Sequence, residues 1–184
     1  MPPQGYIQTF KDRCRVCFTC VRECPAKAIR IQNGQAEVIP ERCIACGNCT
    51  QVCSQGAKQF IRTTSQVLSL LSSGKKVIAC VAPSFPAEFP EYHFTVFVGL
   101  LRGLGFSKVT EVAFGADLVA DRYQRLLAEK GGEKYIAANC PAVVSYIEKY
   151  HPEMVGSLAP IASPMSAMGR ALDEIYGRDY KKGF

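Results

Sequence analysis

The sequence predicts a cysteine-rich α+β domain followed by an α/β domain with a mainly parallel sheet. Two observations lead to this prediction. A motif of four cysteines occurs twice near the N-terminus, first from Cys14 to Cys24 and again from Cys43 to Cys53. From residue 63 onward, apolar runs of strand length alternate with segments whose apolar residues recur at helical spacing. We therefore expect one domain over residues 1–62 and a second over residues 63–184.

The duplicated motif has the spacing C-x2-C-x2-C-x3-C. Its copies read CRVCFTCVREC and CIACGNCTQVC, and they contain Cys14, Cys17, Cys20 and Cys24, then Cys43, Cys46, Cys49 and Cys53. Three thiolates in such a tight loop can converge on three iron corners of one cubane, while the fourth opens a short helix that points away. The motif therefore predicts iron–sulfur clusters of the 4Fe-4S type.

Over about residues 6–62 the chain resembles bacterial two-cluster ferredoxins, in which the fourth cysteine of each motif ligates the other cluster. The resemblance implies a ferredoxin-like domain with two 4Fe-4S clusters. It also implies two ligand sets: Cys14, Cys17, Cys20 and Cys53 for cluster 1, and Cys43, Cys46, Cys49 and Cys24 for cluster 2. Ser54 departs from the family pattern, since the first copy has Pro25 there, and this change bears on cluster potential rather than on ligation.

Two alternative functions compete for this domain. Zinc sites commonly pair two C-x2-C knuckles across a longer gap, so the close spacing disfavours zinc. Nucleic-acid binding is suggested by nine Lys and Arg against four Asp and Glu in residues 1–62, within a net charge of +6. Two oxidised cubanes with four thiolates each carry roughly two negative charges apiece and offset most of this excess. We therefore expect redox protein partners and no nucleic acid.

The sequence also predicts the cellular compartment. No apolar run approaches the ~18 residues of a membrane span, and MPPQGYIQTF lacks the apolar core of a secretion signal. A disulfide framework for the ten cysteines would require a secreted chain. We expect reduced cysteines, no membrane span, a cytoplasmic location and an anaerobic setting.

The second domain is expected to alternate strands and helices, which predicts a parallel sheet with helices packed on it. The predicted strands are residues 75–83, 107–115 and 134–141, and the predicted helices are residues 64–74, 91–106, 116–132, 141–150 and 163–177. Gly74 is expected to close the first helix, and Ser163 to cap the last. The final KKGF is expected to be a solvated tail or a cut.

Two cysteines lie outside the duplicated motif. Cys80 is in the middle of an apolar run and is expected in the core. Cys140 is predicted at the carboxyl end of a strand and directly before a helix, where ligands bind parallel sheets and thiols ionise more readily. Spacing alone leaves a metal-ligating thiolate and a small buried hydrophobe equally open for Cys140. His93 and His151 are expected to be core or surface residues.

The segment AANCPAVVSYIEKYHPEMVGSLAPIASPM resembles the first active-site motif of the large subunit of iron-only (FeFe) hydrogenases. In that motif a strand ends in cysteine-proline, and a helix, a His/Tyr-Pro-Glu turn and a Ser-Pro segment follow. The segment LLRGLGFSKVTEVAFGADLVA and the order of the two domains also match. Residues 63–184 thus resemble the N-terminal half of the hydrogenase catalytic domain, in the divergent, sensory group of the family.

The resemblance implies that Cys140 is a candidate ligand of a further 4Fe-4S or H-cluster-like centre. Two departures limit what this chain can do. Asn139 stands where hydrogen-producing members have a proton-relaying cysteine, and an amide is no general acid near neutral pH. The family's other three cluster cysteines lie on later motifs that this sequence lacks. Hydrogenase activity of this chain alone is therefore not expected, and we expect it to be part of a larger polypeptide or complex.

Three functions are open at this point. The sequence favours an iron–sulfur electron-transfer protein with two 4Fe-4S clusters, part of an FeFe-hydrogenase-like protein or complex. A redox or hydrogen-sensing module is the second function. The third is a catalytic hydrogenase subunit whose remaining H-cluster ligands lie outside this chain.

Overall fold

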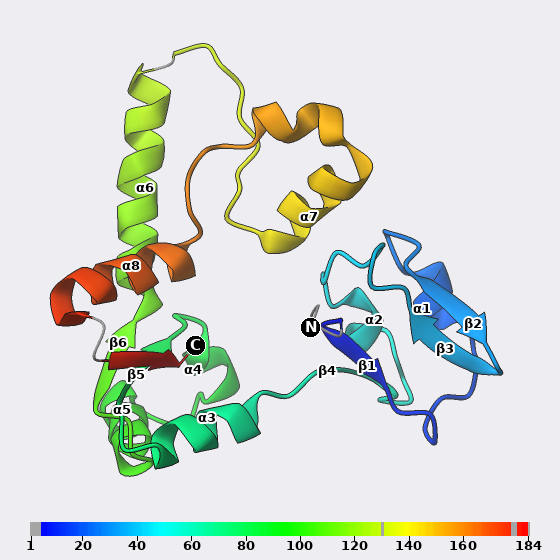
Figure 1. Cartoon of the computed structure of the whole chain (residues 1–184), viewed down its shortest axis with the longest axis horizontal. Helices are drawn as coiled ribbons and strands as arrows, with labels where there is room; N and C mark the ends of the chain where they lie inside the picture. Colours follow the sequence, from blue (N-terminus) through cyan, green and yellow to red (C-terminus); the bar gives the residue numbers. More distant parts are fainter. Residues whose placement is uncertain (1–4, 130, 178–179, 184) are drawn as a thin grey trace. The chain divides into compact units, whose positions relative to one another are not determined.

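The structure is a computed structural model that describes residues 5–129, 131–177 and 180–183. The described residues form two compact units, and each unit combines two chain segments (Figure 1). Unit 1 contains Met1–Arg62 and Cys140–Leu158, and unit 2 contains Thr63–Asn139 and Ala159–Phe184. The segment Cys140–Leu158, which the sequence pattern assigns to the second domain, therefore packs with the N-terminal segment, although the domain division itself stays a prediction.

Unit 1 is built from short elements. Its strands form two antiparallel pairs: β1 (Ile7–Thr9) with β4 (Lys58–Phe60), and β2 (Ile29–Gln32) with β3 (Gln35–Val38). Its helices are α1 (Thr19–Arg22), α2 (Asn48–Gln51), α7 (Pro141–Tyr150) and the 3₁₀ helix η1 (Pro152–Ser157). Asn33 and Gly34 join β2 to β3 with φ angles of 51° and 69°, the left-handed pair that a tight type I′ hairpin turn requires.

The core of unit 1 consists of small side chains and cysteines. Its buried members are Cys20, Cys24, Ala26, Ala28, Ile29, Ala36 and Ile44. Tyr150, at the end of α7, packs against this cluster. Because alanines supply little volume, the core leaves space beside the cysteines instead of filling it.

Unit 2 contains a three-stranded parallel sheet, which confirms the predicted combination of a parallel sheet with helices. Its strand order is β6 (Lys108–Glu111), β5 (Lys76–Val81), β7 (Tyr180–Gly183). In Figure 1 the dark red β7 lies beside β5. Val77 and Ile78 of the central strand are almost fully buried, as expected for a strand with a neighbour on each side.

The helices of unit 2 pack closely at one point. They are α3 (Thr64–Ser72), α4 (Phe85–Glu88), α5 (Phe94–Gly103), α6 (Val112–Glu129) and α8 (Pro164–Tyr176). α6 and α8 meet at Gly115, where a Cβ atom would lie 2.2 Å from the Pro164 carbonyl oxygen, so this approach requires glycine. It brings Met168 and Leu172 of α8 into one cluster with Ile78.

Two predicted boundaries are borne out by the backbone. Ser163 caps α8, because the Ser166 N–H donates to Ser163 Oγ at 3.3 Å, and Pro164 is the first helical residue. Gly74, with a φ of 70°, lies two residues beyond the end of α3.

The predicted strand over residues 134–141 is wrong. Among these residues only Ile136 makes a bridge, and its carbonyl accepts the Ala159 N–H at 2.9 Å. β7 occupies the sheet position beside β5 instead. Most of the KKGF segment, expected to be a solvated tail or a cut, is therefore part of the sheet and not a solvated tail, while Phe184 lies outside the described residues.

The predicted strand over residues 107–115 is only partly correct. Strand β6 ends at Glu111, and α6 begins at Val112 with no intervening loop. The apolar residues after Glu111 are equally compatible with a longer strand. In the structure they belong to α6, whose buried residues Gly115 and Val119 are four positions apart, as expected for one face of a helix.

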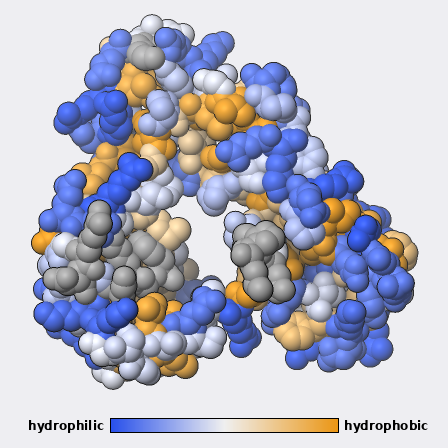
Figure 2. Space-filling model, in the orientation of Figure 1, coloured by the Kyte–Doolittle hydropathy of each residue, from blue (hydrophilic) through white to orange (hydrophobic). Residues whose placement is uncertain are grey.

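The surface of the described residues carries several large apolar side chains, visible as orange areas in Figure 2. On α5, the exposed fractions of Phe94, Val96 and Leu100 are 55%, 49% and 52%. No helix in the described ranges is both long and apolar enough for a bilayer span.

Candidate iron–sulfur sites

The two cysteine loops have the same backbone conformation. In each loop, the residues on either side of the second cysteine have positive φ angles: 53° at Val16 and 64° at Phe18, then 57° at Ala45 and 77° at Gly47. These two pairs occupy equivalent positions in the two motif copies. The sequence repeat is therefore also a repeat of local structure.

This conformation is strained where the residue is not glycine. A β-branched residue such as Val16 rarely has a positive φ, and holding it there costs of the order of 1–3 kcal/mol. At Gly47 a Cβ would come within 2.6 Å of the Phe60 ring. Alternating left-handed residues point successive backbone N–H groups into one concavity, an arrangement found at anion and Fe–S sites. The loops are thus shaped to surround a negatively charged group.

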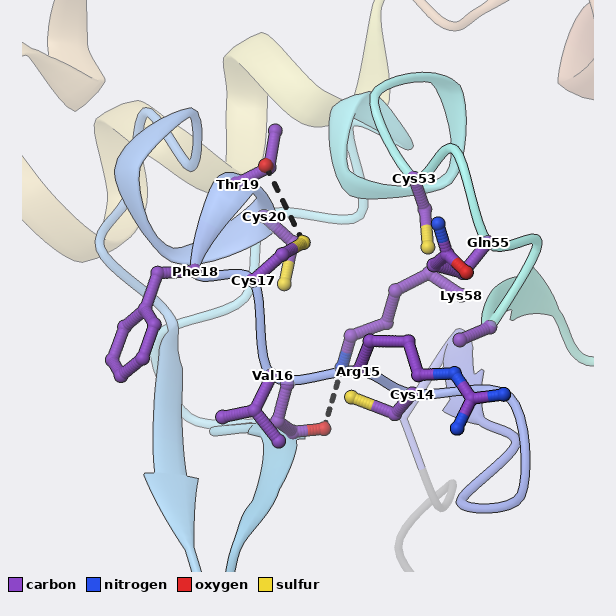
Figure 3. A pocket seen from close by; sticks show the side chains of 12 residues that line it. Cys14, Arg15, Val16, Cys17, Phe18, Thr19, Cys20, Cys53, Gln55 and Lys58 are labelled. Carbon is purple, nitrogen blue, oxygen red and sulfur yellow. Dashed lines mark hydrogen bonds between the residues drawn. The ribbon is translucent and has the colours of Figure 1, made fainter.

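The first loop borders a hollow of about 370 Å³ (Figure 3). Its cysteines are Cys14, Cys17, Cys20 and Cys53. Three of them come from the first motif copy and one from the second. Ala36, Ala57 and Lys58 complete part of the wall.

The second hollow has a volume of about 340 Å³ and the reciprocal composition. Its cysteines are Cys43, Cys46, Cys49 and Cys24. Ile29, Val38 and Ile44 form apolar wall beside them. The structure therefore brings together the two sets of four that the ferredoxin resemblance implies, although ligation itself stays a prediction.

The chemistry of both linings fits iron–sulfur clusters. Neither lining contains a histidine or a carboxylate, so thiolate sulfur is the metal-binding donor that each offers. Among the described residues, no three His, Cys, Asp or Glu side chains are gathered tightly enough for a single metal ion. The four thiols of each set border a volume rather than converge on one point.

Burial makes the metal-free thiols reluctant to ionise. It raises the pKa of Cys49 to about 11 and raises the pKa of Cys20, and in both cases the positive charge of Lys58 opposes the rise. Cys17 is exposed, and its sulfur lies 3.4 Å from Thr19 Oγ1; hydrogen bonds from Thr19 lower the pKa of Cys17. Iron binding must therefore displace protons from the buried thiols.

Helix α7 is fastened to the second cysteine loop by its last turn. The Lys149 ammonium donates to the Cys43 carbonyl at 2.6 Å. The Tyr150 hydroxyl lies 2.8 Å from the Ala26 carbonyl and 3.0 Å from the Arg42 carbonyl, so its proton is shared between two acceptors. These contacts connect residues more than 100 positions apart in the chain and hold α7 beside the second hollow.

We expect Tyr150→Phe to loosen α7. The substitution removes the shared hydrogen bond, which is worth about 1 kcal/mol, so amide exchange in residues 141–150 should accelerate roughly fivefold. Hydrogen–deuterium exchange resolved by peptide measures this effect. Tyr146→Phe is the control, because the described structure records only ring contacts for Tyr146. Equal exchange in both variants would contradict the fastening role of the hydroxyl.

The remaining candidate residues lie apart from the hollows. Cys140 is exposed and forms the N-cap of α7, so its predicted position at a strand end is wrong because that strand does not form. Cys80 packs against the buried cluster of Ile78, Met168 and Leu172. His93 and His151 are outside both linings.

Sequence reasoning missed the position of Lys58. Its side chain is 2% exposed and lines the first hollow. Aligning the two motif copies pairs it with Ile29, so comparing them would have revealed a lysine at a core position. The docking of α7 had no comparable signal, since it depends on contacts between distant segments.

Two known families match successive parts of the chain. Residues 7–54 match the family described as the 4Fe-4S dicluster domain, and this range includes all eight cysteines of the duplicated motif. Residues 75–183 match the family described as iron only hydrogenase large subunit, C-terminal domain. The second match covers more than half of the chain and includes Cys80 and Cys140.

Curated relatives have related names. Iron hydrogenase 1 of Clostridium pasteurianum is 30% identical over an alignment of 115 residues, covering 55% of this chain and 20% of that protein. The periplasmic [Fe] hydrogenase large subunit of Nitratidesulfovibrio vulgaris is 27% identical over 197 residues, covering 96% of this chain and 46% of the relative. A cytosolic Fe-S cluster assembly factor of Yarrowia lipolytica is 29% identical over 76 residues, covering 41% of this chain and 16% of the relative.

The chain spans less than half the length of each of these relatives. Its cysteine loops and its parallel sheet nevertheless correspond to two domains that the family models describe separately. By the extent of the second match, this iron–sulfur protein belongs to the iron-only hydrogenase large subunit family.

Proposed function

We propose that this chain is an electron-transfer protein with two 4Fe-4S clusters. Its ligands are Cys14, Cys17, Cys20 and Cys53 for cluster 1, and Cys43, Cys46, Cys49 and Cys24 for cluster 2. The crossed composition of the two hollows carries this proposal, because each gathers three thiols of one motif copy and the fourth of the other. Bound clusters would supply one-electron chemistry, which requires no acid or base from the protein.

The residues around the hollows would adjust the reduction potentials of the clusters bound there. The Ala28 N–H donates to Cys24 Sγ at 3.2 Å, and the Ala45 N–H donates to Cys43 Sγ at 3.4 Å. Hydrogen bonds to ligand sulfurs stabilise the more negative, reduced state and so raise the reduction potential. Apolar walls limit water access, which acts in the opposite direction.

We propose that the chain works within a larger hydrogenase-like polypeptide or complex, in the cytoplasm, with redox protein partners. The hydrogenase names and the greater lengths of the relatives support the larger polypeptide. One of these relatives is named as periplasmic, so the cytoplasmic location rests on the sequence of this chain alone. The half-exposed apolar side chains of α5 support the larger polypeptide or complex as well, because a cluster of exposed apolar residues is characteristic of a surface that another segment or chain covers.

A second candidate function involves Cys140. The resemblance of the segment around Cys140 to the first active-site motif of iron-only hydrogenases implies that Cys140 is a cluster ligand. The nine residue-to-residue steps from Cys140 to Lys149 correspond to about 14 Å of helix, so α7 would link a centre at Cys140 to the second cysteine loop. Such a centre needs ligands from outside this chain, and it would serve hydrogen sensing or hydrogenase chemistry.

Iron and acid-labile sulfide per chain, measured on protein purified without oxygen, test the proposal. Two clusters predict about eight irons and eight sulfides per chain. About twelve would favour a further centre at Cys140. Zinc in place of iron, or no more than four irons after reconstitution, would contradict the two-cluster proposal.

A further inference from the structure

Lys58 is a buried cation in the middle of unit 1. It is 2% exposed, and lysine is almost never buried to this extent unless its charge has a partner. Its ammonium donates to Thr9 Oγ1 at 2.5 Å and to the Ala36 carbonyl at 2.8 Å. The Thr9 hydroxyl itself donates to the Ala36 carbonyl at 2.9 Å. Residues of β1, β3 and β4 therefore hold the ammonium in one place.

These contacts give the Lys58 ammonium hydrogen-bond acceptors but do not neutralise its positive charge. Both acceptors are neutral oxygens, and no carboxylate forms an ion pair with Lys58 among the described residues. An uncompensated buried charge costs several kcal/mol. The nearby groups that can become anionic are thiols: Lys58 lines the first hollow together with Cys14, Cys17, Cys20 and Cys53 (Figure 3).

The motif copies differ at this position. Ile29 is the counterpart of Lys58 in the first copy, and it lines the second hollow where Lys58 lines the first. Both side chains are buried, at 6% and 2% exposure. The two otherwise similar sites thus differ by one fixed positive charge.

We propose that the Lys58 ammonium is the internal counter-charge of the cluster pair and makes the two clusters electrochemically inequivalent. This inference rests on the proposed two-cluster function. Reduction adds one electron, and hence one negative charge, to a cluster. A fixed cation beside the first hollow stabilises that reduced state, so Lys58 raises the potential of cluster 1 more than that of cluster 2.

The test is an anaerobic redox titration monitored by electron paramagnetic resonance, with dithionite as reductant. The variant Lys58→Met keeps an unbranched side chain, one atom shorter than lysine, and removes its charge. In this variant one midpoint potential should fall, and the other should fall less. The larger change should be at least tenfold in the reduction equilibrium constant, which is about 59 mV for a one-electron couple. Lys58→Arg should keep both constants within about threefold of the wild-type values.

Lys11→Met is the matched control, because it removes the same charge from an exposed position of the same unit and should leave both potentials unchanged. A Lys58→Met protein with eight irons and wild-type potentials would overturn this inference and leave the two-cluster function intact. If Lys58→Met holds no clusters, the iron content of Lys58→Arg decides. Eight irons in the Arg variant would support the role of the positive charge, whereas loss of the clusters in that variant as well would overturn the inference. A wild-type chain without iron would refute the proposed function itself.

Discussion

Replacing Cys17 and Cys53 together by alanine should leave one intact 4Fe-4S cluster per chain, whereas replacing Cys46 and Cys53 should leave none. The reason is that Cys17 and Cys53 line the same hollow, while Cys46 lines the other. The first pair of substitutions therefore spares one complete set of four thiols, and the second pair breaks both sets. Counting 4Fe-4S spins by electron paramagnetic resonance after reduction, together with iron analysis, measures the difference.

The two double variants serve as controls for each other, since each loses two thiols and each loses Cys53. If every cluster were ligated within its own motif copy, the results would be reversed. Cys17→Ala with Cys53→Ala would then break both clusters, and Cys46→Ala with Cys53→Ala would spare the first. That reversed pattern would refute crossed ligation while leaving the number of clusters at two.

The cysteine sets illustrate how far a sequence can predict a site. The close thiol spacing within each motif copy predicts a 4Fe-4S site, and the resemblance to two-cluster ferredoxins implies the crossed sets of four cysteines that line the two hollows. The burial of Lys58 has a weaker signal, its alignment with Ile29 in the first motif copy, because an isolated lysine in a strand pattern usually points to solvent. Its burial depends on acceptors in β1 and β3, and only the folded module brings those strands around it.

The errors in the second domain have a common physical cause. A strand forms only where a neighbour offers a run of backbone partners, and residues 134–141 are apolar enough for a strand but have a bridge at Ile136 alone. β7 is rich in lysine and glycine, a poor strand composition, yet it lies at a sheet edge where charged residues are tolerated. Its Tyr180 packs on the cluster of Ile78, Met168 and Leu172, which gives the edge strand an apolar anchor.

Gly115→Ala should destabilise unit 2 although alanine is the better helix former. The added Cβ would lie 2.2 Å from the Pro164 carbonyl oxygen and 2.9 Å from the Met168 Cβ, so α6 and α8 must separate. Overpacking of this kind costs about 1–3 kcal/mol, more than the roughly 0.5–1 kcal/mol that glycine-to-alanine contributes in a helix. Urea denaturation followed by far-UV circular dichroism measures the change in the free energy of unfolding.

Gly99→Ala is the matched control and should have the opposite sign. Gly99 lies inside α5, and a Cβ built there meets nothing within 4 Å, so alanine should stabilise the helix by about 0.5–1 kcal/mol. The same chemical change thus separates helix propensity from helix packing. A stabilising effect at both positions would show that α6 and α8 do not approach through Gly115, and that Met168 and Leu172 owe their burial against β5 to some other contact.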